Sequence, residues 1–147
     1  MIKRFLLTLF TLLFFLPPVY AAKPEIYSSI FGGAINGYDP VAYFIEGKPV
    51  KGKRAHTLKY KGATWRFSSE KNKQAFKNSP QKYAPAYGGY CAYAVSNGYT
   101  ASTDPDAWTI HNGKLYLNYS IGVRAKWSKD IPGNIRKANA NWPKVLE

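Results

Sequence analysis

Apolar and polar residues alternate over residues 57–61 and again over residues 64–68. Alternation with a period of two is typical of a β-strand with one buried face, so these two segments predict a β-hairpin. A second hairpin is predicted over residues 108–117, where apolar segments flank Asn112 and Gly113. That dipeptide strongly favours a two-residue hairpin turn.

Helix start signals precede three short segments in the first half of the chain. A polar capping residue followed by proline or by an acidic residue is typical of a helix N-terminus. The predicted helices begin after Asp39, Ser69 and Ser79, and they end at Phe44, at Asn78 and at Tyr83 or Ala84, respectively.

The densest apolar and aromatic segment spans residues 87–95. Its small residues predict a core helix that begins at Gly88-Gly89 and is closed by Asn97-Gly98.

The C-terminal part of the chain is predicted to be helical. Its apolar residues Ile131, Ile135, Ala138 and Trp142 form one stripe at helical spacing. Together these patterns predict an α+β fold: a small single domain with two short β-hairpins packed among short helices and a C-terminal helical segment.

The first residues have the features of a signal peptide. Lys3 and Arg4 precede an apolar run over residues 5–16, which is shorter than the roughly 20 residues of a spanning helix. We predict that residues 1–21 are removed during export. Residues 22–147 would then form a periplasmic or secreted domain that does not span a membrane.

Composition narrows the class of protein. The aromatic content of 16% excludes disorder for most of the chain, and a single cysteine excludes an internal disulfide framework. The formal net charge is +13. Export makes nucleic acid an unexpected partner, which leaves two interpretations of this charge: attraction to an anionic envelope surface, or simple solubility.

Several short motifs carry a resemblance to a known family. They are Asp39-Pro40-Val41, Tyr60-Lys61-Gly62 and Phe67–Asn72, followed by Phe76, Pro80 and Tyr83. This set resembles the YHS domain over about residues 38–83. YHS domains are small modules of heavy-metal-transporting ATPases, some oxygenases and many small bacterial proteins. The downstream residues 87–92 and 113–118 resemble an exported subgroup of YHS-domain proteins.

The chain departs from the metal-binding form of that family at the positions of its thiols. The resemblance places cysteines where this chain has Ala42, Ser68 and Asn72. Alanine donates no ligand atom, and the other two side chains offer only weak neutral oxygen donors, whereas thiolates select copper(I) or zinc. The family's metal role therefore cannot be transferred to these residues.

Three other residues are candidate metal ligands: Cys91, His111 and His56. His56 stands at about the place of the histidine for which the YHS domain is partly named. If the three side chains approached one another, their donor set would suit copper or zinc. The alternatives are a buried core thiol at Cys91 and solvated surface histidines at the other two positions.

The sequence thus predicts an exported, non-enzymatic YHS-domain protein with weak transition-metal binding through Cys91, copper first. No catalytic residue is predicted, and copper or zinc is the one cofactor considered. An enzyme with a cysteine nucleophile is disfavoured, because no Lys, Arg or His within residues 86–96 would activate the thiol. The alternative function is a metal-free module whose basic, tyrosine-rich surface docks on an envelope protein or an anionic surface.

Overall fold

A computed structural model describes residues 22–147 of the chain, so the predicted signal peptide lies outside the described residues. The strands are β1 (Ser28–Ser29), β2 (Gly33–Ala34), β3 (Lys53–Tyr60), β4 (Ala63–Phe67), β5 (Trp108–His111) and β6 (Lys114–Leu117). The α-helices are α1 (Ala42–Ile45), α2 (Glu70–Asn78), α3 (Pro80–Tyr83), α4 (Ala92–Ser96), α5 (Ile121–Trp127) and α6 (Ile131–Asn141). Four 3-10 turns complete the described elements: η1 (Ile35–Gly37), η2 (Ala86–Gly89), η3 (Ser128–Asp130) and η4 (Lys144–Leu146). Short helices among antiparallel two-stranded sheets confirm the predicted α+β class.

Both predicted hairpins are present. Strands β5 and β6 pair in antiparallel register around a two-residue turn. The turn residues Asn112 and Gly113 both have positive φ, 49° and 74°, as a hairpin turn that matches the twist of its strands requires. Strand β3 is longer than predicted, and its pairing with β4 shifts register between Lys53 and Thr57.

The predicted helix after Ser69 is also confirmed. The Ser69 Oγ accepts a hydrogen bond from the Asn72 backbone N–H at 3.1 Å and so caps α2. Phe76 projects from α2 into the core and is fully buried. In the C-terminal segment, α6 carries Ile131, Ile135 and Ala138 of the predicted stripe and ends at Asn141. Trp142, the fourth residue of the stripe, follows the helix with an extended backbone.

The helix predicted to run from Gly88-Gly89 to Asn97-Gly98 is wrong in its first part. Only residues 92–96 are α-helical, and Tyr87, Gly88 and Gly89 have positive φ. The reason is a long-range contact: Gly88 lies so close to the Glu25 carbonyl oxygen that a Cβ atom there would clash with it. Tertiary packing therefore imposes a left-handed turn on a segment of helix-forming composition.

The hairpin of β1 and β2 was not predicted. Its strands have two residues each, too short to show an alternating pattern in the sequence. Its second strand lies against β4, where Gly33 contacts the Thr64 backbone.

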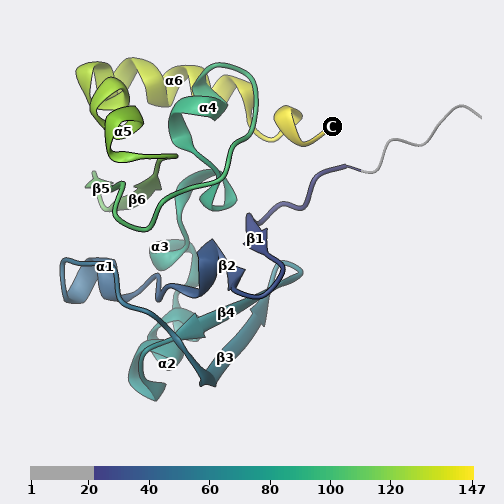
Figure 1. The fold of residues 1–147 in the computed structure, drawn as a ribbon, viewed down its shortest axis with the longest axis vertical. Coiled ribbons are helices and arrows are strands. Elements are labelled where there is room, and N and C mark those ends of the chain that lie inside the picture. Colours follow the sequence, from purple (N-terminus) through teal and green to yellow (C-terminus); the bar gives the residue numbers. More distant parts are fainter. Residues whose placement is uncertain (1–21) are drawn as a thin grey trace, which may run out of the picture.

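The core consists of two clusters of buried residues. One cluster joins α1, α2 and the β3–β4 hairpin with β6, around Trp65, Phe67 and Phe76. The other joins η2, α4, α5 and α6, around Tyr87 and Trp127. Figure 1 shows the same division: α4, α5 and α6 gather at one end, and α2 with β3 and β4 lies at the other.

Among residues 22–147, no helix combines the length and the apolar character needed to cross a membrane.

Candidate functional site

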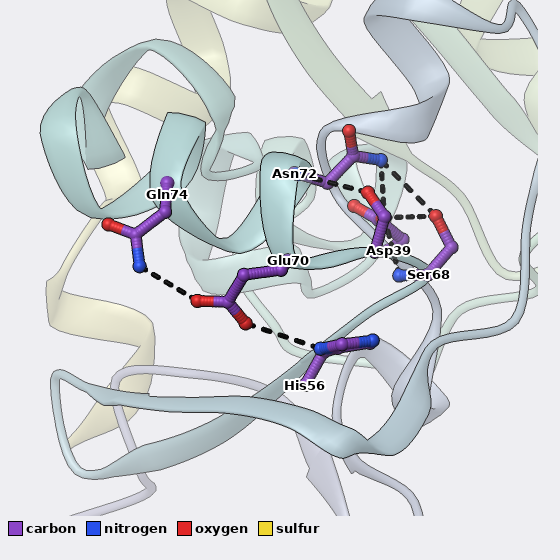
Figure 2. A network of polar contacts seen from close by, with 7 residues as sticks. Asp39, His56, Ser68, Glu70, Asn72 and Gln74 are labelled. Carbon is purple, nitrogen blue, oxygen red and sulfur yellow. Dashed lines mark hydrogen bonds and ion pairs between the residues drawn. The ribbon is translucent and has the colours of Figure 1, made fainter.

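A buried carboxylate lies at the place where the resemblance puts metal-binding thiols. Asp39 is fully buried between the start of α1 and the start of α2. Its Oδ2 accepts hydrogen bonds from the Ser68 backbone N–H and the Ser68 hydroxyl, both at 2.8 Å, and from the Asn72 Nδ2 at 2.7 Å. Its Oδ1 accepts from the backbone N–H groups of Val41 and Ala42. Figure 2 shows Asp39, Ser68 and Asn72 converging on one another.

This cluster is a structural crosslink. Five donors satisfy the Asp39 carboxylate, as a buried charge-bearing group requires. Ser68 and Asn72, which stand at two of the three thiol positions, donate to this single acceptor. Ala42, at the third position, is fully buried and contributes its backbone N–H. In this chain, hydrogen bonds therefore join the segments that carry thiol ligands in the metal-binding form of the YHS domain.

His56 lies beside this cluster but pairs outward. Its Nδ1 lies 3.3 Å from the Glu70 Oε2, and Glu70 is exposed. The pKa of Glu70 is lowered, first by the hydrogen bond that Gln74 donates and then by the one from His56. Figure 2 shows that this chain of contacts runs along the outside of α2. An exposed pair of this kind contributes little to stability.

Cys91 is buried and hydrogen-bonded. The residue is 1% exposed and caps α4, because its Sγ accepts from the Ala94 backbone N–H at 3.5 Å. The same Sγ accepts from the Tyr119 N–H at 3.3 Å, and the thiol donates to the Asn118 Oδ1 at 3.5 Å. The sulfur thus joins the start of α4 to the segment after β6.

Asn118 is a residue that the sequence analysis did not single out. It is fully buried, and its Oδ1 also accepts from the Tyr93 backbone N–H at 3.0 Å. Its Nδ2 has no hydrogen-bond partner among the described residues. Nothing in the sequence marks this asparagine as part of the thiol's surroundings, because it lies far from Cys91 along the chain.

The three predicted metal ligands lie on different elements. His111 ends β5, where it pairs with Lys114 beside the hairpin turn. His56 is on β3 with Glu70 as its partner, and Cys91 is at the start of α4. Within residues 22–147, no three His, Cys, Asp or Glu side chains gather as a set of metal ligands.

A pocket of about 320 Å³ lies where the β3–β4 turn, η2, β6 and α6 meet. We call it the central pocket, and its lining includes Lys61, Tyr87, Lys114, Tyr116, Asn139 and Trp142. Aromatic side chains form one part of its wall, and polar and charged groups such as Glu25, Lys61 and Lys114 form another, a combination that small-molecule sites also use.

The two lysines of the central pocket, Lys61 and Lys114, have different partners. Lys61 pairs with Glu25, which also lines the pocket, and this hydrogen bond raises the pKa of Lys61. The Lys114 Nζ donates to the Gln81 carbonyl oxygen at 3.2 Å and has no carboxylate partner among the described residues. Burial, and then the charge of Lys61, lower the pKa of Lys114. An anion bound in the pocket would stabilise the charged form of Lys114 and so raise its pKa again.

The aromatic wall is fixed by its own contacts. The Tyr87 hydroxyl donates to the Asn139 Oδ1 at 2.9 Å, and burial raises the pKa of Tyr87. The Tyr87 ring lies 6.1 Å from that of Tyr116 and 5.9 Å from that of Trp142, between centroids. The surface offered to a ligand is therefore preorganised.

A second pocket of about 320 Å³ reaches Cys91. Tyr93, Tyr99, Tyr119 and Lys126 also line it, and we call it the thiol pocket. Three tyrosines thus line the same pocket as the buried Cys91.

Comparison with protein-family models matches residues 41–87 to the YHS domain. The comparisons with curated proteins and with solved structures gave no significant match. The matched segment runs from the start of α1 to η2, so it contains the Asp39-centred cluster except for Asp39 itself.

Proposed function

The chain carries a YHS domain in residues 41–87, and from this premise we propose that it is a non-enzymatic binding module that takes a small organic anion in the central pocket. One observation carries the proposal. Lys114 is a partly desolvated ammonium group with no carboxylate partner among the described residues, and it lines a pocket with an aromatic wall. Like the alternative function of the sequence analysis, this function needs no metal, but it uses a pocket for a small anion and not a basic, tyrosine-rich surface that docks on an envelope protein or an anionic surface.

The chemistry of the lining defines the ligand class. Lys114 and Lys61 favour a carboxylate or phosphate group, and Glu25 neutralises part of their charge. Tyr87, Tyr116 and Trp142 favour a planar or apolar body that packs on their rings. The function supported best is therefore binding of a monoanion with a planar part, in the exported domain that the N-terminal pattern predicts.

Titration with benzoate tests this function, with tryptophan fluorescence as the readout, because Trp142 is the tryptophan that lines the central pocket. We expect Lys114→Met to weaken benzoate binding about tenfold or more, because it removes a charge-assisted contact. The matched control is Lys126→Met, which removes a lysine of the thiol pocket and is expected to leave benzoate binding unchanged. Benzyl alcohol, a neutral analogue, is expected to bind more weakly than benzoate.

The pH dependence gives a second readout. Because the pKa of Lys114 is lowered, its ammonium loses the proton at a lower pH than an ordinary lysine, whose pKa is about 10.4. Benzoate binding should therefore weaken as the pH rises through that lowered value. Equal affinity of the wild type and Lys114→Met for benzoate, or equal binding of benzoate and benzyl alcohol, would contradict the proposal.

Copper binding through Cys91 is the second candidate function. The observation that favours it is that Cys91, a soft donor, is among the residues that line the thiol pocket. Copper would have to displace hydrogen bonds of the buried sulfur. A copper(I) competition titration compares the wild type with Cys91→Ala. We expect the wild type to hold copper more tightly if the sulfur is a ligand. Equal weak uptake by both proteins would remove this candidate.

A further inference from the structure

Two large apolar side chains protrude from the turn between β1 and β2. Ile30 is 93% exposed and Phe31 is 85% exposed. The other large hydrophobic residues found exposed, such as Ile45 and Ile121, keep almost half of their surface covered. Adjacent, almost fully exposed isoleucine and phenylalanine side chains contribute nothing to the core, and such surface is typical of an interaction site.

The structure holds this turn firmly in place. The Phe31 carbonyl oxygen accepts a hydrogen bond from the Arg66 Nη2 at 2.8 Å, and the Gly32 N–H donates to the Ser29 Oγ at 3.0 Å. Gly33 has a φ of 74° and lies against the Thr64 carbonyl oxygen of β4, where no side chain would fit. The turn that carries the two side chains is therefore already ordered. Little conformational entropy would be lost when these side chains bind to another surface.

The surroundings of the turn are basic. Arg66 donates a hydrogen bond to it. Lys59 lies opposite Thr64 in the β3–β4 register, and Thr64 is the residue whose backbone Gly33 contacts. Residues 47–69, which include the whole β3–β4 hairpin, contain lysine and arginine throughout and no Asp or Glu. We call Ile30 and Phe31 the apolar tip. Exposed apolar side chains next to basic residues combine two features that favour peripheral binding to anionic membranes.

We propose that the β1–β2 turn docks the protein on an anionic lipid bilayer. The Ile30 and Phe31 side chains insert at the boundary between headgroups and acyl chains, and Arg66 with the neighbouring lysines contacts the anionic headgroups. The predicted export would bring the domain to membrane surfaces. This inference is independent of the central pocket, because none of the residues that line that pocket belongs to the turn.

Co-sedimentation with vesicles tests the proposal. The wild type is expected to bind vesicles of phosphatidylglycerol and phosphatidylcholine, and to bind less at high salt or to phosphatidylcholine alone. Replacing both apolar residues, Ile30→Ser with Phe31→Ser, should lower partitioning about tenfold or more. Ile45→Ser with Ile121→Ser is the matched control, because it removes two exposed apolar side chains elsewhere, and it should bind like the wild type.

A second variant reports insertion directly. The fluorescence of Phe31→Trp should be quenched by vesicles that contain brominated lipid, and more strongly than the fluorescence of the wild type. The proposal is overturned if the tip variant binds anionic vesicles as tightly as the wild type, or if the wild type does not bind them at low salt. It is also overturned if light scattering shows a wild-type dimer that the tip variant loses, because the tip would then contact a second copy of the chain.

Discussion

Replacement of Asp39 by alanine tests whether the buried cluster is a crosslink. The substitution removes the acceptor of five hydrogen bonds and leaves three backbone N–H groups without their partner, those of Val41, Ala42 and Ser68. The Asn72 Nδ2 keeps one acceptor, the Ser68 Oγ at 3.2 Å. Each buried donor left without a partner costs about 1–3 kcal/mol. Some relaxation reduces the sum, so we expect Asp39→Ala to lower the free energy of unfolding by about 3–5 kcal/mol.

Urea denaturation followed by tryptophan fluorescence measures this loss, with an unchanged m-value as the sign of an unchanged fold. A loss of that size is a large part of the about 5–15 kcal/mol that stabilises a typical domain. Asp130→Ala is the matched control, because Asp130 caps α6 through one hydrogen bond, to the Gly133 N–H at 3.0 Å. Loss of that cap should cost about 1 kcal/mol. If Asp39→Ala costs no more than Asp130→Ala, the cluster is not the crosslink described here.

Two further predictions concern the thiol and the buried tyrosines. Because Cys91 is 1% exposed and engaged in three hydrogen bonds, a maleimide should react with it at neutral pH only after denaturation; fast labelling of the folded protein would contradict its burial. Burial raises the pKa of Tyr43, Tyr87, Tyr90 and Tyr116 in the folded protein. The stability that these buried hydroxyls contribute is therefore complete below the ordinary tyrosine pKa of about 10. It is lost as the pH rises from there through the higher folded-state values. Urea midpoints at increasing alkaline pH should therefore fall above about pH 10, and a constant midpoint would show that these hydroxyls titrate normally.

The sequence was sufficient for the elements that local signals determine. Asn112-Gly113 predicted the β5–β6 turn because both residues must adopt positive φ there. Ser69 predicted the start of α2 because its hydroxyl caps the helix within three residues. In each case, the cause and the effect lie next to each other in the chain.

Long-range contacts explain what the sequence could not predict. The helix expected to begin at Gly88-Gly89 starts only at Ala92, because Gly88 meets the backbone of Glu25, near the start of the described residues. The sequence showed that thiols are absent from positions 68 and 72, but not that these two side chains meet at Asp39. The apolar tip was missed for another reason, since Ile30 and Phe31 look like core residues until the fold shows that nothing covers them.

The Asp39-centred cluster also limits which amino-acid substitutions this domain tolerates at positions 68 and 72. A cysteine at position 68 alone would weaken two contacts of the cluster, and a single thiol could not hold a metal ion. A cysteine at position 72 alone would leave the carboxylate without the Asn72 donor. The hydrogen-bonded form and a thiolate form of the domain are thus separated by less stable intermediates, and single substitutions cannot convert one into the other without loss of stability.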